Sequence, residues 1–585
     1  MTPLEGSASS DSTVADGMRI DWDVPIEMDD GLVLRADVFR PIGDGQYPVI
    51  MTLGPYAKGL PFQTGYAGMW KTIEAGYPDV LRGSTNKYQN WETCDPEKWV
   101  PDGYVCVRVD SRGAGRSPGY LDVYSPRENL DYYHCIEWAG TQPWSNGKVG
   151  LLGISYYAVN QWLVAQLQPP HLAAICPFEG YQDFYRECNR HGGILNTFMP
   201  EWFPVQVMSV QYGNGSTAVN PNTGVPAVDG AQLSDEELAA NRSDLPGELR
   251  ARELDDQWYR DRSAELSEIT VPLLSAASWT HSLHSRGNFE GYLDVSSKEK
   301  WLEVHGLEHW TVFYTDYGVA LQKRFFGHFL KGEDTGWTEQ PPVYLNLRAV
   351  DGSFVGRGEQ EWPLARTKWT RFYLGSDGTT LSDTPGEPGS VEFDALGRGL
   401  TFLTDPLSEP MEITGPSAAK LFAASSTEDA DFFVVIRVLD PDGNDVAFVS
   451  AQDPRGIITK GWLRASHRKL DPLRSLPYRP FHTHDEKQPL TPGETVELDV
   501  EIWPTSVLVP AGYRVGVSVV GRDFHWEGDG PWPQIYGIDM RGDGIFHHND
   551  AGDRPESVFG GRTTIRTGGD SPSYVLLPLI PSEAS

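Results

Sequence analysis

The sequence predicts a doubly wound, mostly parallel α/β sheet with a helical insertion, followed by an all-β sandwich. The stretch 147–162, GKVGLLGISYYAVNQW, is typical of a buried strand, a tight turn and a helix. The strand YVCVRVD runs straight into the glycine-rich loop SRGAGRSPG, as strands do at the crevice of an open α/β sheet. From Pro341 onward, short alternating strands are separated by Gly, Pro and Asp turns, which predicts the sandwich.

Length and composition narrow the class of protein. At 585 residues the chain is long enough for two or three domains. Its 81 acidic and 48 basic residues give a formal charge of −33, which argues against nucleic acid or an anionic membrane as a partner. The first residues lack a basic start and an apolar core, and no apolar run is long enough to span a bilayer. We therefore expect neither a signal peptide nor a membrane span.

The five cysteines form no metal-type Cys-x-x-Cys pair, so reduced thiols in a cytoplasmic protein are the simplest interpretation. We expect no metal and no cofactor. The sequence leaves open whether the chain forms a homo-oligomer.

The first domain is expected over residues 18–180 and 266–340, after a small, polar segment 1–17 that is expected to be disordered. A hairpin turns at Asp30-Gly31, and a further strand, YPVIMTLGPY, ends at Tyr56. A helix over 125–140 leads back to the strand that precedes Ser155. The next strand, HLAAICPFEG, places Glu179 just past its end.

Residues 181–265 lose the alternation and become helical and aromatic, which predicts a cap over the site. The sheet resumes with VPLLSAASW and KWLEVHGLEHW, and a long helix, YGVALQKRFFGHFLKG, closes the domain. Residues 341–585 form the predicted β-sandwich, with strands such as PVYLNLRAV and DFFVVIRVLDPDG.

Ser155, at the apex of the strand-turn-helix, is the candidate nucleophile, because such an elbow pushes the hydroxyl out of the sheet. The general pattern G-x-S-x-G is not matched cleanly, since Tyr157 stands where the second glycine belongs and the small residue, Ala158, comes one place later. The alternative is that Ser155 only caps the following helix.

Two further stretches carry weaker signals. The run 547–550, HHND, has the residue types of a metal site but no partners at ligand spacing, so an exposed turn is the simpler interpretation. The run 112–116, RGAGR, lacks the lysine and hydroxyl residue of a phosphate-binding loop.

The order VRVDSRGAGRSPG, IEWAGTQPWSNGKVGLLGISYYA, a helical insertion, VPLL and a terminal β-domain resembles the X-prolyl dipeptidyl-peptidase and cocaine-esterase family of serine hydrolases. The resemblance covers the chain from about residue 20 and implies an α/β-hydrolase domain, a helical cap and a C-terminal jelly roll. It implies acyl transfer through Ser155. The Tyr156 amide and the Tyr56 phenol would form the oxyanion hole. Ala158 stands where the family usually has glycine.

The general base should be a histidine late in the first domain, because hydrolases of this fold order their triad as serine, acid, histidine. His305 ends a predicted strand, where its ring would be packed, whereas His309 lies beyond Gly306 in a loop. We therefore favour His309.

The triad acid is the main departure from the family. The family places an aspartate shortly after the strand that corresponds to VPLLSAASW, and this chain has His281 there. A histidine cannot orient and stabilise the catalytic imidazole as a carboxylate does. We favour Glu179 as the acid. Asp183, Glu308 and an enzyme without a triad acid remain alternatives.

The sequence as a whole predicts a serine hydrolase that cleaves a small ester or acyl amide through an acyl-enzyme intermediate. One alternative is an X-Pro dipeptidyl peptidase, which needs an acidic anchor for the free amine of its substrate. Another is a binding protein whose hydrolase domain is silent and whose jelly roll recognises carbohydrate.

Overall fold

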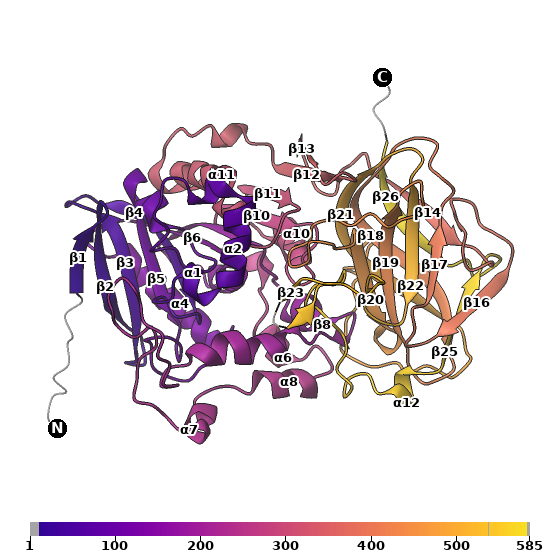
Figure 1. Ribbon diagram of the computed structural model, residues 1–585, viewed down its shortest axis with the longest axis horizontal. Helices are drawn as coiled ribbons and strands as arrows, with labels where there is room; N and C mark the ends of the chain where they lie inside the picture. The colour runs from indigo at the N-terminus through magenta and orange to yellow at the C-terminus, as the bar shows by residue number, and fades with distance from the viewer. Residues whose placement is uncertain (1–10, 536, 582–585) are drawn as a thin grey trace.

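The computed structural model describes residues 11–535 and 537–581. An α/β unit and a β-sandwich lie side by side, and the short helices of the insertion lie along the lower edge of the α/β unit (Figure 1). The sheet of the α/β unit has the order β1-β2-β3-β5-β4-β6-β7-β10-β11-β12-β13. Its strands are β1 (Asp11–Ala15), β2 (Met18–Glu27), β3 (Val33–Pro41), β4 (Tyr47–Gly54), β5 (Val105–Asp110), β6 (Ser145–Ile154), β7 (Leu172–Phe178), β10 (Leu273–Ser278), β11 (Lys300–His305), β12 (Val343–Ala349) and β13 (Phe354–Glu359).

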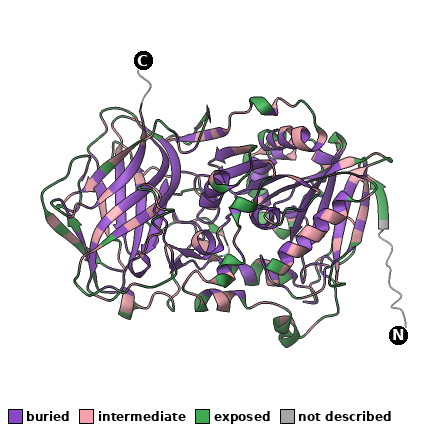
Figure 2. Ribbon diagram, turned by 180° about the vertical axis from the view of Figure 1, so that it is seen from behind, coloured by how far each residue is buried: buried purple, intermediate pink, exposed green. Residues whose placement is uncertain are grey.

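The neighbouring strands from β5 to β12 run parallel, and the strands at the two ends of the sheet are antiparallel. β5, VCVRVD, is buried along its whole length, as a strand covered on both faces should be. Figure 2 shows the same continuous burial in the central strands of both units.

The helices of the α/β unit are α1 (Phe62–Gly65), α2 (Ala67–Gly76), α3 (Pro96–Trp99), α4 (Pro126–Gly140), α5 (Tyr156–Ala165), α10 (Ser285–Asp294) and α11 (Asp316–Phe326), with short turns η1 (Pro78–Leu81), η2 (Val100–Asp102), η7 (Val312–Tyr314), η8 (Gly327–Lys331) and η9 (Trp337–Glu339).

The segment between β7 and β10 consists of short helices and one small hairpin. Several begin at a polar cap, as α7 does at Ser234, where a complete capping box satisfies the first amides. Its elements are η3 (Phe184–Asn189), β8 (Arg190–His191), β9 (Ile194–Leu195), α6 (Phe198–Trp202), η4 (Phe203–Val207), η5 (Met208–Val210), α7 (Asp235–Ala240), α8 (Leu245–Ala251), α9 (Gln257–Arg260) and η6 (Leu266–Glu268).

The C-terminal unit is a sandwich of antiparallel strands. One sheet has the order β15-β14-β26-β18-β21, with β25 and β16 added beside β18, and the other has the order β17-β22-β19-β20. The elements are β14 (Lys368–Leu374), β15 (Leu381–Ser382), β16 (Gly389–Asp394), β17 (Leu400–Leu403), β18 (Met411–Ser425), β19 (Asp431–Leu439), β20 (Thr459–Arg464), η10 (Ala465–His467), β21 (Val496–Val509), β22 (Arg514–Val520), β23 (Gln534–Ile535), β24 (Ile538–Asp539), α12 (Glu556–Phe559), β25 (Arg562–Thr567) and β26 (Tyr574–Ile580).

Two expectations from the sequence need correction. Residues 11–15, part of the segment expected to be disordered, form β1, because their backbone pairs with residues 18–22 across a tight turn. Residues 1–10 lie outside the described part of the chain. The stretch PVYLNLRAV, expected to open the sandwich, instead supplies β12 of the first sheet, where Leu302 of β11 pairs with Val343.

Strand β12 connects the two units directly. Its first half pairs with β11, and its last residues, Arg348 and Ala349, pair in parallel with Val507 and Leu508 of β21. The α/β sheet and the sandwich therefore share one continuous hydrogen-bonded strand, which fixes the loops of the sandwich relative to the site.

A buried arginine joins three parts of the chain. Arg286, on α10, is 1% exposed and forms ion pairs with Glu187 of the insertion and Glu501 of β21, at 2.7 Å each. Burial raises the pKa of the Glu501 carboxyl and would favour its neutral form if the guanidinium were removed. Each carboxylate thus depends on Arg286 for its charge partner.

We expect Arg286→Ala to lower the free energy of unfolding by about 3–5 kcal/mol, because the substitution leaves two buried carboxylates without their partner. Urea denaturation followed by tryptophan fluorescence would measure the loss. The control is Arg82→Ala, which removes an ion pair with Asp316 whose side chains are 68% and 55% exposed, and should cost less than about 1 kcal/mol. Equal losses in the two variants would contradict this account of the joint.

Candidate active site

Ser155 lies between β6 and α5 in a backbone conformation that few non-glycine residues adopt. Its φ is 55° and its ψ is −113°. The strain is held by hydrogen bonds from the Ser155 amide to the carbonyl oxygens of Phe178 and Glu179, at 3.1 and 3.2 Å, and from the Ile154 amide to that of Glu92. Glu92 and Glu179 also have positive φ, at 60° and 49°. Three strained residues therefore support one another at the carboxyl ends of β6 and β7.

Two glycines make room for this elbow. A Cβ on Gly153 would lie 2.3 Å from the Cβ of Tyr157, and a Cβ on Gly180 would lie 2.7 Å from the Cβ of Ala158. The methyl group of Ala158, in place of the usual glycine, is thus accommodated by the absence of a side chain at Gly180. The helix can pass close to the chain that leaves β7.

Glu179 and His309 form a buried pair. Glu179 Oε2 lies 2.8 Å from His309 Nδ1, and both residues are at most 4% exposed. Burial alone would raise the pKa of Glu179, but the neighbouring His309 and His305 hold it below its usual value. The ionised carboxylate places the hydrogen of His309 on Nδ1, so Nε2 is the nitrogen left to exchange a proton.

Glu92 occupies the other side of the same imidazole. Its Oε1 lies 3.1 Å from His309 Nε2. Burial raises the pKa of Glu92 to about 7. Burial alone would lower the pKa of His309, but the Glu179 carboxylate and the hydrogen bonds to both carboxyl groups raise it to about 9. His309 is therefore a basic imidazole between two acids.

A second histidine contacts Ser155. His284, in the loop between β10 and α10, places Nε2 at 3.0 Å from Ser155 Oγ. Its Nδ1 accepts a hydrogen bond from the Tyr181 amide at 3.1 Å. Burial and the nearby charge of His309 hold the pKa of His284 well below its ordinary value. His284 is thus a neutral ring beside Ser155.

The two expected oxyanion donors lie next to each other. The rings of Tyr56 and Tyr156 pack edge to face with 5.8 Å between centroids. The Tyr156 amide begins α5 and donates to no other group among the described residues. Tyr56 follows β4 in a loop that is held by the hydrogen bond from the Lys58 amide to buried Asp110, at 2.6 Å.

A small cavity of about 30 Å³ opens beside Ser155, and Tyr56, Glu92, His284 and His309 also line it. It adjoins a larger cavity of about 570 Å³, because both are lined by Tyr56, Met69, Gln206 and Gln452.

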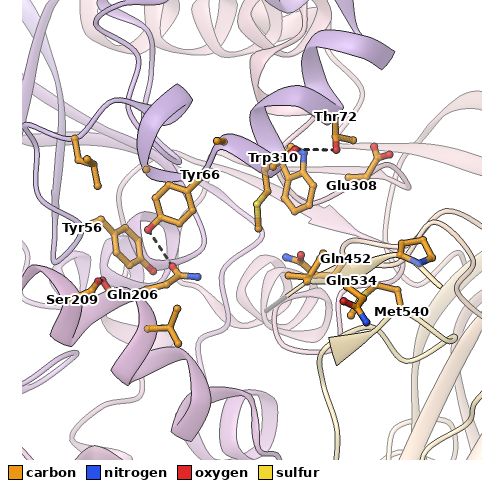
Figure 3. Close-up of a pocket in the computed structure, with 18 of the residues that line it drawn as sticks. Tyr56, Tyr66, Thr72, Gln206, Ser209, Glu308, Trp310, Gln452, Gln534 and Met540 are labelled. Carbon is orange, nitrogen blue, oxygen red and sulfur yellow. Dashed lines mark hydrogen bonds between the residues drawn. The ribbon is translucent and has the colours of Figure 1, made fainter. Parts of the chain in front are cut away.

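Figure 3 shows the wall of the larger cavity. Tyr66 and Trp310 face Gln452, Gln534 and Met540 across it. The first two residues belong to the α/β unit and the other three to the C-terminal unit, so both units form the wall.

The structure brings together most, but not all, of the residues that the sequence singled out. Glu179 meets His309, and the histidine within hydrogen-bonding distance of Ser155 Oγ is His284. His281 lines the small cavity from the same loop as His284. Of the alternative acids, Asp183 is bound to Arg186, and Glu308 accepts a hydrogen bond from Tyr77 at the larger cavity.

Sequence reasoning missed Glu92 and His284. His284 follows β10 by a few residues, so the rule that singled out Glu179 at the end of β7 would have found it. Glu92 lies in an irregular loop that carries no periodic signal.

The histidine pair at 547–548 also needs correction, because His548 is not in an exposed turn. It is fully buried, binds Asp523 through Nδ1 at 2.8 Å and faces His191 of the insertion at 2.8 Å.

Comparison with known proteins gives matches along most of the chain. Residues 30–311 match the model of the X-Pro dipeptidyl-peptidase (S15 family), and residues 335–576 match that of the X-Pro dipeptidyl-peptidase C-terminal non-catalytic domain. A putative serine esterase of Mycobacterium bovis is 26% identical over 85% of this chain and 90% of its own length. The cocaine esterase of a Rhodococcus species is 24% identical over 95% of this chain and 98% of its own length.

A solved CocE/NonD family hydrolase from Staphylococcus aureus is 32% identical, with a TM-score of 0.83 and coverage of 98% of both chains. Together with the elbow and the matched models, this likeness defines a serine hydrolase of the α/β-hydrolase class with a C-terminal β-domain. The chain belongs to the X-prolyl dipeptidyl-peptidase and cocaine-esterase family. Within the described residues, no helix has the length and hydropathy to cross a membrane.

We expect Gly180→Ala to lower kcat/KM at least tenfold, because the new methyl group would collide with Ala158 and displace the neighbouring Glu179. Overpacking of this kind also destabilises by about 1–3 kcal/mol. Gly76→Ala, at the last residue of α2, is the matched control, since a Cβ there meets nothing within 4 Å and the residue lines neither cavity. Steady-state kinetics on a p-nitrophenyl ester would measure the effect. A Gly180→Ala variant with the kinetics of the control would contradict the packing described for the elbow.

Proposed function

We propose that this serine hydrolase cleaves a small ester or acyl amide through an acyl-enzyme intermediate, with Ser155 as nucleophile, His309 as general base and Glu179 as the triad acid. The observation that carries the proposal is the 2.8 Å contact between Glu179 and His309 Nδ1, in the same small cavity as Ser155. A carboxylate on Nδ1 directs the basic lone pair to Nε2 and stabilises the imidazolium that forms.

The proposed reaction begins when His309 Nε2 leaves its hydrogen-bond partner Glu92 and accepts a hydrogen bond from the Ser155 hydroxyl instead. The hydroxyl proton moves to Nε2 while Oγ attacks the carbonyl carbon, and the carbonyl electrons move to its oxygen. The Tyr156 amide and the Tyr56 phenol are the donors proposed for that oxyanion. His309 then gives its proton to the leaving group. Water repeats the sequence on the acyl-enzyme and releases the acid.

The larger cavity supports a substrate of modest size. Its volume of about 570 Å³ is within the range of small-molecule sites. Its wall combines aromatic rings, such as Tyr66 and Trp310, with the amides of Gln206, Gln452 and Gln534. This lining suits an uncharged organic group that accepts or donates a few hydrogen bonds.

Removal of an X-Pro dipeptide is a second candidate, favoured by one observation. Glu308 is the one carboxylate among the described residues that line the larger cavity, and it would attract a free amino terminus. A relative named putative Xaa-Pro dipeptidyl-peptidase, from Streptomyces avermitilis, is 23% identical over 84% of this chain.

We expect Ser155→Ala to lose turnover of p-nitrophenyl acetate and labelling by a fluorophosphonate probe, because both need the Oγ nucleophile. The wild type should be labelled by the probe and should turn over the ester.

Replacing Glu179 by Gln should lower kcat by roughly 10²–10⁴-fold, since the imidazole of His309 then loses the anion that orients it. Turnover of Ala-Pro-p-nitroanilide by the wild type, with loss of that turnover in Glu308→Gln, would instead indicate the peptidase. A wild-type enzyme that neither labels nor turns over would end the esterase proposal.

The pH dependence follows from the two acids around His309. A general base must be neutral to accept a proton, so kcat/KM should rise with pH to a plateau. The midpoint of this rise should lie near the pKa of His309, about 9. Glu92→Gln removes a carboxylate that raises this pKa, so its midpoint should move to lower pH while the plateau is kept. The measurement is kcat/KM for a p-nitrophenyl ester across pH, with the uncatalysed rate subtracted. A midpoint that does not move in Glu92→Gln would contradict this role of the carboxylate.

A further inference from the structure

Three buried histidines gather around the nucleophile. One ring nitrogen of each of His281, His284 and His309 lies within 4.8 Å of the others. The rings of His281 and His284 are 4.4 Å apart between centroids, and those of His284 and His309 are 5.5 Å apart and nearly parallel. The proposed function uses His309 alone, so the other two rings still need an explanation.

Backbone amides fix the hydrogens of these two rings. The Leu283 amide donates to Nδ1 of His281, and the Tyr181 amide donates to Nδ1 of His284, each at 3.1 Å. A backbone amide is always a donor, so both Nδ1 atoms are acceptors. In a neutral imidazole the hydrogen must then be on Nε2. The Nε2 of His281 has no partner among the described residues.

This arrangement does not fit a metal centre. A histidine that binds a metal through one nitrogen donates its other N–H to a carboxylate, a carbonyl group or water. Here the far nitrogens of His281 and His284 accept instead of donating. A metal on their Nε2 atoms would require loss of both hydrogens, or of both backbone hydrogen bonds.

The same arrangement makes His284 a poor base for Ser155. Its Nε2 lies 3.0 Å from Oγ but already carries the hydrogen. A protonated ring would also turn a hydrogen on Nδ1 toward the Tyr181 amide, which would repel it. His284 can therefore donate to Ser155 Oγ but cannot readily take its proton.

We propose that His284 is a catalytic residue that donates its Nε2 hydrogen to Ser155 Oγ throughout the reaction and does not act as the base. The inference deepens the proposed function and rests on it. A hydroxyl oxygen can accept while its own hydrogen points elsewhere. With His284 on the Oγ lone pair, the Ser155 hydrogen is free to turn toward His309.

The proton balance of the acyl transfer is unchanged by this donor. The O–H bond of Ser155 breaks, its proton goes to His309 Nε2, and the Oγ–carbon bond forms. Negative charge grows on Oγ as the proton leaves, and the His284 N–H stabilises it. In deacylation Oγ leaves the carbonyl carbon and recovers its proton from His309, while the hydrogen on His284 stays in place.

The test compares His284→Gln with His284→Met. Glutamine can present an amide N–H in place of the lost donor, whereas methionine fills the space without one. Both variants are measured for kcat and for the pH midpoint of kcat/KM on a p-nitrophenyl ester, beside Ser155→Ala and His309→Gln. His134→Met, on the partly exposed face of α4, controls for the methionine itself.

We expect His284→Met to lower kcat by roughly 10–10³-fold, as removal of one preorganised donor does, and His284→Gln to recover most of the loss. The pH midpoint should stay at that of His309 in both. Dialysis against a chelator should leave the wild-type kcat unchanged.

Three results would overturn the proposal. His284→Met could keep full activity, both His284 variants could be as inactive as His309→Gln, or activity lost to the chelator could return with Zn²⁺. In each case the activities of Ser155→Ala and His309→Gln decide whether the proposed function fails as well. If those two variants are inactive, the proposed function stands without this role of His284. If Ser155→Ala keeps wild-type activity, the proposed function fails and the inference fails with it.

Discussion

One residue, Glu179, links Ser155 and His309. Its carbonyl oxygen accepts from the Ser155 amide at 3.2 Å, and its carboxylate lies 2.8 Å from His309 Nδ1. Its own amide donates to the carbonyl oxygen of Ala276 in β10. Because the residue is fully buried, water does not compete for these bonds. The backbone that strains Ser155 and the side chain that orients His309 therefore belong to the same rigid position, and a displacement there would disturb both.

Contacts farther from Glu179 hold the sandwich and the α/β unit together around the site. β12 pairs with both β11 and β21, so the sandwich is attached to the sheet by main-chain hydrogen bonds. Arg286 adds a charged joint between α10, the insertion and β21. Burial removes water from both sides of this joint, which makes the ion pairs strong and their loss costly. The loops of the sandwich are thereby held against the cavity beside Ser155.

Much of this could be predicted from the sequence, because the signals were local. The apolar run before Ser155 predicted β6 and the elbow, and the end of HLAAICPFEG placed Glu179 at the carboxyl edge of the sheet. The contact between Glu92 and His309 joins residues 217 positions apart, and no periodicity predicts such a pairing. The direction of the hydrogen bonds on His284 depends on where a backbone amide points, which the sequence pattern does not contain. β12 was misassigned because alternation predicts a strand but not its partner.

The shared wall of the large cavity has a consequence for how such enzymes diversify. Gln452 and Met540 lie in loops of the sandwich and Gln534 in the short hairpin β23–β24, all more than a hundred residues along the chain from any catalytic candidate. Loops of this kind tolerate insertion and exchange better than strand ends do. Evolution, or a designer, can therefore reshape what the enzyme accepts by changing loops of a domain that carries none of the proposed catalytic side chains.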